Sequence, residues 1–342
     1  MRYPKLMQKG DTIGICAPSS GVGDEIKWGR LDNAIKNIKD LGYNAVETPE
    51  VRQNIKCVSA DSEKRAANFI SLYENPDVTA IIPIWGGEFL MDILPHLDFE
   101  KIAALPAKWL CGYSDTTTLS FPLTVVCSVA SVHGSNLMNM GFARIHETDS
   151  RAFDVMSNIV TEQKSWDTYG AFTSWDDYSA QPYNLNKPSV WKSLREEDKN
   201  RDSFSGMMIG GCMDTLCKLI GTRFAPVEAF LNKYKQHGFI WAMESCEMSA
   251  AEIYRTLWQM RECGWFKYCK GFLFGRPDGY SHTGGFELTD ALKDALGSLN
   301  VPVIYDADIG HIPPQMQIVN GALGKVAFCG GTAVVTQELK GV

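Results

Sequence analysis

Three residues with the chemistry of a hydrolytic triad, a serine, a carboxylate and a histidine, each follow a predicted apolar strand. Ser114 comes after the strand at residues 109–111 and a turn at Gly112, and Asp115 suits the start of a helix. A serine on such a strand-to-helix turn holds its hydroxyl clear of the sheet, and the first helical N–H groups point at the carbonyl that it attacks. We therefore predict that Ser114 is a nucleophile; a helix-capping serine beside a turn glycine is the alternative.

The acid and the base are predicted in the second half of the chain. Glu244 closes the apolar run at residues 238–243, and His311 follows Gly310 after the strand at residues 301–306. The order nucleophile, acid, base is that of α/β-hydrolase triads, although geometry and not order defines a triad. In this hypothesis the histidine takes the serine proton and the glutamate orients the imidazole.

A glycine pair supplies a candidate oxyanion hole. Gly86 and Gly87 follow the buried run at residues 78–85, and glycine lets a backbone N–H approach a substrate without a Cβ in the way. We predict the amides of Gly87 and Asp115 as the two donors. The alternative is that the pair forms only a turn.

Two further residues and one further class of function stay open. His133 ends another predicted strand and is either a neighbour of the active site or a hydrogen-bonded structural histidine. Cys111 is the candidate for a cysteine hydrolase, although it lies inside the strand before the turn. A protein that binds a peptide or nucleotide without cleaving it is the alternative to an enzyme.

Alternating strands and helices must position these residues in the first half. Apolar strands are predicted at residues 12–17, 44–47 and 78–85, with helices at residues 26–41 and 60–73 between them. Such alternation predicts a mostly parallel sheet covered on both faces, which binds ligands at the carboxyl ends of its strands.

The length of 342 residues and a change in character near residue 166 predict two domains. We expect an N-terminal α/β domain at residues 1–165, an aromatic-rich interdomain linker at 166–205, and a strand-rich α+β domain at 206–342 with a barrel-like end. The active site is then expected at the interface, with the nucleophile from the first domain and the acid and base from the second.

Composition excludes several classes of partner. The net charge is −7 and no run is rich in Lys or Arg, which argues against binding to nucleic acid and favours a small-molecule substrate. The N-terminus has no apolar secretion core and no stretch is long enough to cross a bilayer, so a cytoplasmic protein without membrane contact is expected. The ten cysteines stand singly, without a CxxC pair, and are expected to be reduced thiols with no metal site.

These motifs together resemble the LD-carboxypeptidase family of serine peptidases, over nearly the whole chain. The resemblance rests on Gly10-Asp11-x-Ile13, Ala17-Pro18-Ser19-Ser20, Gly86-Gly87, Leu94-Pro95-x-Leu97-Asp98, Gly112-Tyr113-Ser114-Asp115-x-Thr117, Ile209-Gly210-Gly211, Glu244, Gly275-Arg276 and Gly310-His311. It implies a Rossmann-like N-terminal domain, a β-rich C-terminal domain, a Ser114–Glu244–His311 triad and a homodimer. The hydrolysis expected of such a triad requires no metal or organic cofactor.

The family has two branches that differ in substrate. Muramoyltetrapeptide carboxypeptidases remove D-alanine from cell-wall peptides, whereas microcin-immunity (MccF-like) members cleave an aminoacyl group from a modified adenylate. The long aromatic segment favours the MccF-like branch, in which a ring stacks on the adenine; Trp175 is our candidate. Gly86, Gly211 and Cys212 are further expected substrate-binding residues, although MccF-like members commonly have Asn where this chain has Cys212.

Overall fold

The first half of the chain forms a four-stranded parallel sheet. The structure, a computed structural model, describes residues 1–195 and 201–340. The strand order in this sheet is β2-β1-β3-β4, and the bounds are β1 Thr12–Cys16, β2 Asn44–Glu47, β3 Val78–Pro83 and β4 Trp109–Leu110. Its helices are α1 Glu25–Asp40, α2 Ser62–Glu74, α3 Phe99–Ala104, α4 Thr117–Val125 and α5 Glu147–Met156. The short 3-10 helices of this half are η1 Pro49–Arg52, η2 Leu90–His96, η3 Ser114–Thr116 and η4 Leu137–Met140; η6 Gly297–Leu299 lies in the second half.

Local sequence signals explain where α1 begins and which face it buries. Asp24 caps the helix, because its carboxylate accepts a hydrogen bond from the backbone N–H of Lys27. Leu31, Ala34 and Ile38 recur at helical spacing and are fully buried. The apolar face predicted from the periodicity is therefore the face that packs on the sheet.

The second half forms an eight-stranded mixed sheet. The order is β6-β16-β15-β10-β11-β12-β13-β9, with β10 to β13 parallel and the other strands antiparallel to their neighbours. The bounds are β6 Glu162–Lys164, β9 Lys192–Ser193, β10 Arg201–Cys212, β11 Phe239–Glu244, β12 Cys269–Gly275, β13 Val303–Ala307, β15 Leu323–Cys329 and β16 Thr332–Glu338. Its helices are α6 Met213–Leu219, α7 Val227–Tyr234, α8 Ala250–Glu262 and α9 Leu288–Leu296.

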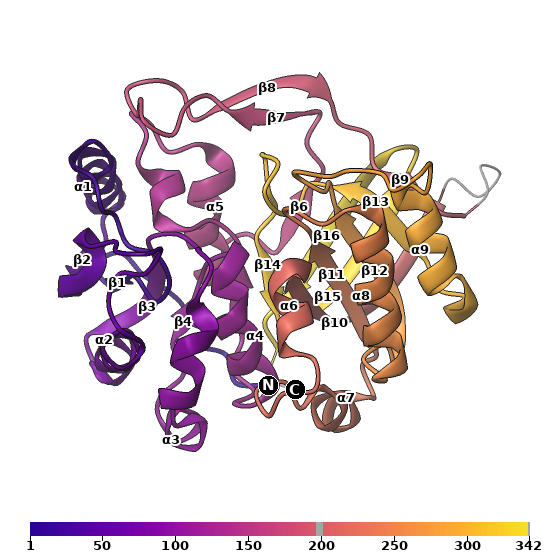
Figure 1. Cartoon of the computed structure of the whole chain (residues 1–342), viewed down its shortest axis with the longest axis horizontal. Coiled ribbons are helices and arrows are strands. Elements are labelled where there is room, and N and C mark those ends of the chain that lie inside the picture. Colours follow the sequence, from indigo (N-terminus) through magenta and orange to yellow (C-terminus); the bar gives the residue numbers. More distant parts are fainter. Residues whose placement is uncertain (196–200, 341–342) are drawn as a thin grey trace.

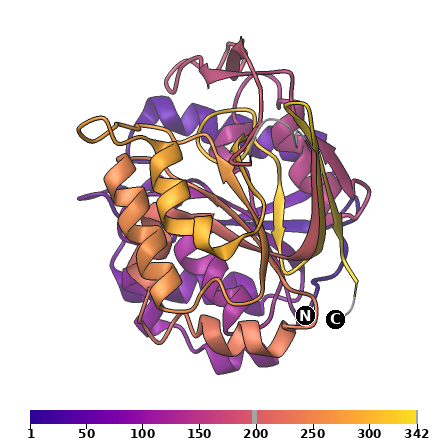
Figure 2. The ribbon, with the colours of Figure 1, turned by 90° about the vertical axis from the view of Figure 1, so that its right-hand side faces the viewer.

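The shape of this sheet confirms one expectation and corrects another. The α/β class, with a parallel N-terminal sheet and a β-rich C-terminal part, is confirmed (Figures 1 and 2). The barrel-like end is wrong, because the antiparallel strands β15 and β16 extend the same sheet, which ends at β6 and β9. Helices α8 and α9 lie side by side on one face (Figure 2), and α8 begins with the predicted capping box of Ser249 and Glu252.

Two features tie the halves together. Strand β5 (Ser131–His133) pairs antiparallel with β14 (Ile318–Asn320), which lies far away in the sequence. Helix α4 contacts both α6 and β10. The domain limits at 165 and 206 stay a prediction. Strand β6 precedes the first limit and β10 begins before the second, yet both strands belong to the eight-stranded sheet of the second half.

The aromatic segment that we expected as a linker contains a β-hairpin. Strands β7 (Thr168–Phe172) and β8 (Tyr183–Pro188) pair antiparallel and project from one end of the molecule, reaching from the α5 side toward the β13 side (Figure 1). The hairpin is bonded to both halves, since the backbone N–H of Ala143 donates to Tyr178 and that of Gly170 to Pro313. Within residues 1–195 and 201–340, no helix has the length and apolar character needed to cross a membrane.

Candidate active site

Ser114 lies on a strained turn between β4 and α4. Its φ of 61° is in the left-handed region that residues with a Cβ avoid. A 3-10 turn, Ser114–Thr116, precedes α4, where the sequence predicted that the α-helix itself begins at Asp115. A Cβ on Gly86 would lie 2.9 Å from the Ser114 Oγ, so glycine is required for this close approach. The geometry is that of a nucleophile elbow.

Glu244 and His311 form a hydrogen-bonded pair. Glu244 is the last residue of β11, and its Oε2 lies 2.8 Å from His311 Nδ1. Gly310 has a φ of 100°, and a Cβ there would lie 2.5 Å from the same carboxylate oxygen. Glycine before the histidine is therefore what allows the two side chains to meet.

The pairing shifts the pKa of both groups. Burial is the largest single influence and lowers the pKa of His311, but the Glu244 carboxylate, together with Cys246 and Tyr113, outweighs burial and holds this pKa well above 6.5. Burial conversely favours the neutral form of Glu244, while His311 and then His133 bring the pKa of the carboxyl below its ordinary value. In the part of the chain that the structure describes, His311 Nε2 has no hydrogen-bond partner, which leaves this nitrogen for a substrate-side proton.

One cavity brings the predicted residues together. Its volume is about 320 Å³, and Ser114, His311, Gly86, Gly87 and Trp175 are all among the residues that line it. Glu244 lies behind His311 and is 1% exposed. The serine, the imidazole and the glycine pair thus face one space, as the strand-end argument predicts.

The two segments predicted to form the oxyanion hole lie close to Ser114. Gly87 has a φ of 145°, and a Cβ there would lie 2.4 Å from the hydroxyls of Ser19 and Ser20. The Asp115 nitrogen lies 3.0 Å from the position that a Cβ on Gly86 would occupy. Both predicted donor segments therefore border the Ser114 hydroxyl.

Asp115 has a second role that the sequence did not indicate. Its carboxylate accepts hydrogen bonds from Ser19 Oγ at 2.6 Å, from the backbone N–H of Leu90 at 2.9 Å and from Thr118 Oγ1 at 3.0 Å. Two other chain segments, at Ser19 and Leu90, are joined to the elbow in this way. Burial raises the pKa of this carboxyl, and these three bonds oppose the shift.

Two more residues of the site were missed because only tertiary structure places them there. Asn136 accepts from the backbone N–H of Tyr113 at 3.3 Å and donates to its carbonyl at 3.3 Å. Tyr113 in turn packs against His311, with ring centroids 4.8 Å apart. In the sequence, Asn136 closely follows the predicted strand that became β5. This position after a strand end is the one feature that could have suggested Asn136 as a site residue.

A second cavity of about 270 Å³ lies on the other side of Ser114. Cys212, Asp214, Lys218 and Glu247 are among its lining residues. Of the predicted substrate-binding residues here, Cys212 lines this cavity and Gly211 packs against α4, because a Cβ on Gly211 would lie 2.5 Å from Thr117 Cγ2. Ser114 and Gly87 thus line both cavities.

Trp175 forms an aromatic wall of the first cavity. It lies in the loop between β7 and β8 and is 43% exposed. The guanidinium of Arg30 stacks between Trp175 and Phe142, 4.5 Å and 4.2 Å from the two ring centroids. Arg30 also donates to the Trp175 carbonyl at 3.1 Å. Phe172 also packs against the indole, with ring centroids 4.2 Å apart and an angle of 31° between the ring planes. The part of Trp175 that stays exposed borders the cavity.

The structure gives different answers for Cys111, the candidate cysteine nucleophile, and for His133, the candidate neighbour of the active site. Cys111 is fully buried, donates to the Ser135 carbonyl at 3.6 Å, and has a pKa raised by burial to about 12, so it does not suit a nucleophile. His133 is 1% exposed and lies 3.5 Å from Glu244 Oε1, which makes it a neighbour of the pair. Burial lowers its pKa to about 4, so it is neutral.

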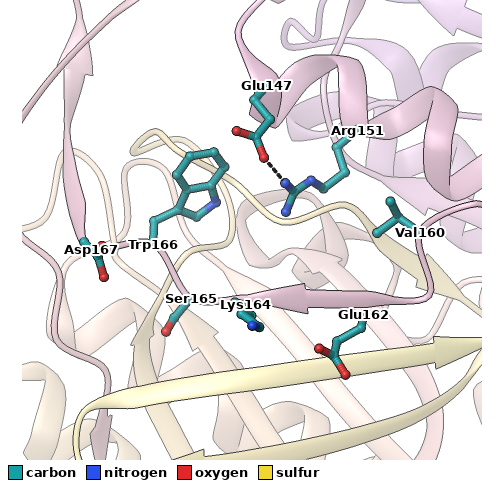
Figure 3. A pocket seen from close by; sticks show the side chains of 8 residues that line it. All are labelled: Glu147, Arg151, Val160, Glu162, Lys164, Ser165, Trp166 and Asp167. Carbon is teal, nitrogen blue, oxygen red and sulfur yellow. Dashed lines mark hydrogen bonds and ion pairs between the residues drawn. The ribbon is translucent and has the colours of Figure 1, made fainter.

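Another cavity lacks this chemistry. It has a volume of about 380 Å³ and lies between α5 and β6 (Figure 3). Its arginine, Arg151, is paired with Glu147 and lies over the ring of Trp166. None of Ser114, Glu244 and His311 lines it.

Sequence comparison finds relatives over most of the chain. Residues 13–134 match the LD-carboxypeptidase N-terminal domain, and residues 205–326 match the LD-carboxypeptidase C-terminal domain. A putative carboxypeptidase of Vibrio cholerae is 24% identical over 96% of this chain and 96% of that protein. The microcin C7 self-immunity protein MccF of Escherichia coli is 26% identical over 96% and 94%. A probable murein peptide carboxypeptidase of Bacillus subtilis is 23% identical over 97% and 93%.

Solved structures share the fold. An MccF-like protein from Bacillus anthracis superposes with a TM-score of 0.82 at 20% identity, covering 99% of this chain and 100% of that one. MccF in complex with aspartyl sulfamoyl adenosine gives 0.80 at 21% identity, with 99% and 98% covered. The resemblance of the sequence motifs is confirmed by both matched domains. The chain therefore belongs to the LD-carboxypeptidase family and is a serine peptidase.

Proposed function

We propose that this enzyme is an MccF-like amide hydrolase that cleaves an aminoacyl or peptidyl group from a modified adenylate. The observation that carries the proposal is Trp175, an indole backed by a cation in the same cavity as Ser114 and His311. Aromatic side chains of this kind stack on nucleobases. The MccF structure with aspartyl sulfamoyl adenosine, which has the same fold, supports this choice of substrate class.

The proposed reaction uses the residues of the elbow and the pair. His311 Nε2 takes the proton of Ser114, whose oxygen attacks the carbonyl carbon and forms a tetrahedral intermediate. The amides of Gly87 and Asp115 stabilise its oxyanion, and one such donor contributes about 2.7–4 kcal/mol in a related system. His311 then protonates the leaving nitrogen, and water releases the acyl group from the serine. Glu244 holds the imidazole and stabilises its charged form.

Replacement of the nucleophile tests the mechanism. Ser114→Ala should abolish turnover and keep ligand binding, because only the attacking oxygen is lost. Turnover by mass spectrometry and binding by calorimetry measure the two effects, with Ser71→Ala on the exposed face of α2 as control. A Ser114→Ala enzyme with most of its activity would overturn the triad.

A second substrate class has its own support. The relative named a probable murein peptide carboxypeptidase points to a muramoyl tetrapeptide, from which the same triad would release D-alanine. Side-by-side turnover of an aminoacyl sulfamoyl adenosine and a muramoyl tetrapeptide distinguishes the two. Cleavage of the tetrapeptide alone would refute the adenylate proposal and leave Trp175 a packing residue.

A protein that only binds its ligand is the alternative of another class. It would ignore a serine-directed fluorophosphonate probe, whereas the proposed enzyme should be labelled at Ser114 in the wild type and unlabelled in Ser114→Ala. A cytoplasmic homodimer remains the expectation from the sequence. Cell fractionation and light scattering of the purified chain test these two points.

A further inference from the structure

Cys212 lies beside the Glu244–His311 pair. It is the last residue of β10 and stands directly opposite Glu244 in the parallel pairing with β11. The Cys212 Sγ, a carboxylate oxygen of Glu244 and a ring nitrogen of His311 all lie within 4.8 Å of one another. Cys212 and Glu244 are each 1% exposed.

These three donors are a set that suits a thiophilic cation. Thiolate sulfur, imidazole nitrogen and carboxylate oxygen bind zinc at about 2.0–2.3 Å in a tetrahedral arrangement. Ligand atoms around such an ion are therefore closer together than 4.8 Å, and shifts of about 1 Å would close the site.

Unsatisfied polar atoms provide an independent observation. Glu244 Oε1 and His311 Nε2 are buried and have no hydrogen-bond partner within residues 1–195 and 201–340; His133 Nε2, which is likewise unpartnered there, lies 3.5 Å from Glu244 Oε1. Buried polar atoms of this kind normally have a partner or an ion. The Cys212 thiol donates to Asp214 Oδ2 at 3.5 Å, and Cys212 lines the second cavity together with Ser114, so an ion can reach the sulfur from the substrate side.

We propose that Cys212, Glu244 and His311 form a binding site for one thiophilic divalent cation, with Zn²⁺ as the chemical type, and that this cation inhibits the enzyme. On binding, the Cys212 S–H bond breaks, a sulfur–metal bond forms and the proton leaves to solvent, without any redox change. The cation occupies the imidazole that must accept the Ser114 proton. The site goes beyond the proposed hydrolysis, which itself requires no metal.

Titration with Cd²⁺ measures metal binding to the Cys212 sulfur directly. Cd²⁺ bound to a thiolate gives a sulfur-to-metal charge-transfer band in the ultraviolet, and this signal does not depend on turnover. The background protein carries Cys57→Ser, Cys263→Ser and Cys329→Ser, because these three thiols are exposed. Cys212→Ser is compared in this background with Cys217→Ser, a matched change on the neighbouring helix α6, and circular dichroism checks that each variant folds.

The expected result is one Cd²⁺ per chain in the background protein and in Cys217→Ser. Cys212→Ser should lose the band and bind at least about 100-fold more weakly, since a direct ligand matters at least as much as its outer-shell partners. Zn²⁺ should compete for the site and block fluorophosphonate labelling of Ser114 until a chelator is added. Absence of the band from the background protein, or its persistence in Cys212→Ser, would overturn the proposal. If the protein cleaved neither substrate, the proposed function would fail, but the Cd²⁺ titration would still test the metal site because the band does not depend on turnover.

Discussion

At the scale of single residues, the Glu244–His311 pair would set the pH range of the proposed reaction. A raised His311 pKa means that the imidazole carries a proton near neutral pH and becomes a base only as the pH rises. The paired carboxylate therefore makes His311 a stronger base and moves the acid limb of the pH profile upward.

We expect kcat/KM to rise with pH along a limb centred above 6.5. Glu244→Gln should move this limb to lower pH and lower the maximal rate, because the neutral amide no longer stabilises the imidazolium. Rates measured from pH 5 to 10 with chelator present test this. An unchanged midpoint in Glu244→Gln would show that another group controls the limb.

Asp149 makes stability depend on pH in the opposite sense to most carboxylates. It is completely buried, accepts hydrogen bonds from Ser135 and Tyr183, and has a pKa raised by burial from 3.8 to about 7. A group whose pKa is higher in the folded state stabilises most below its unfolded pKa and loses this contribution as pH rises through the folded pKa. The window is therefore about pH 4–7.

Asp149→Asn should remove this pH dependence. In the wild type, the free energy of unfolding is expected to fall by up to about 4 kcal/mol across that window from this group alone, from about 1.4 kcal/mol per pKa unit. Urea titrations at pH 4, 5.5 and 7 measure it, with the exposed Asp40→Asn as control. Parallel curves for wild type and Asp149→Asn would contradict the argument.

The candidate catalytic residues could be predicted from the sequence, but the side chains that hydrogen-bond to the turn around Ser114 could not. Ser114, Glu244 and His311 each follow an apolar strand, and parallel strands bring such ends to one edge. Asn136 and the carboxylate of Asp115 act through contacts with segments far along the chain, which periodicity and spacing do not record.

At the scale of elements, the buried carboxylate of Asp308 binds residues on both sides of the β7–β8 hairpin. Asp308 accepts from the backbone N–H of Trp166 at 2.7 Å and from Ser189 Oγ at 3.2 Å, residues that flank the hairpin on its two sides. It also accepts from Trp191 Nε1 at 3.0 Å and Arg276 Nη1 at 2.7 Å. Asp308 thus fixes both ends of the hairpin three residues before His311.

Asp308→Ala should destabilise the fold and loosen the hairpin. Removal of one partner of a buried ion pair costs about 3–5 kcal/mol, because the Arg276 charge is left uncompensated. Chemical denaturation measures the loss, and limited proteolysis should cut first within the hairpin. Asp40→Ala, which breaks the exposed pair with Lys36, should change little. Equal effects of the two variants would refute this role.

The loop of the same hairpin carries the proposed base platform. Trp175→Ala should raise KM for an aminoacyl sulfamoyl adenosine by about 10-fold or more, since stacking on a base contributes about 1–3 kcal/mol. The rate at saturation should change less, because Trp175 does not touch the scissile bond. Trp258→Ala on the exposed face of α8 is the matched control. An unchanged KM would remove the support for an adenylate substrate.

Helices and strands with regular spacing were predictable, and the hairpin was not. Strand β2 and the capped helices α1 and α8 follow from alternation, helical periodicity and capping residues. The aromatic residues of the hairpin have no clean period, because the rings contact side chains of other elements, such as Arg30. Continuation of one sheet through β15 and β16 is likewise set by long-range pairing, which a strand pattern alone cannot distinguish from a barrel.

At the scale of the whole molecule, the active site combines parts that are far apart in the chain. In the proposed mechanism, the nucleophile and the glycine pair follow β4 and β3 of the first sheet, the acid and base lie at or after the ends of β11 and β13 of the second, and the aromatic wall comes from the β7–β8 loop. Figure 1 shows how these elements are arranged. The sequence predicted a site between two parts because the triad candidates fall on either side of residue 166. The sequence did not predict that strands of the two halves pair, as β5 and β14 do in the structure.

That pairing sets an order of events during synthesis. Ser131 and Asn320, which face each other across β5 and β14, are 189 residues apart. At about 5–20 residues per second, a ribosome needs about 10–40 s to make the second strand after the first. During that time the nascent chain already carries its reactive serine but neither a complete triad nor a closed sheet edge. With the proposed triad, the nascent chain therefore cannot hydrolyse its substrate until His311 and strand β14 have been made.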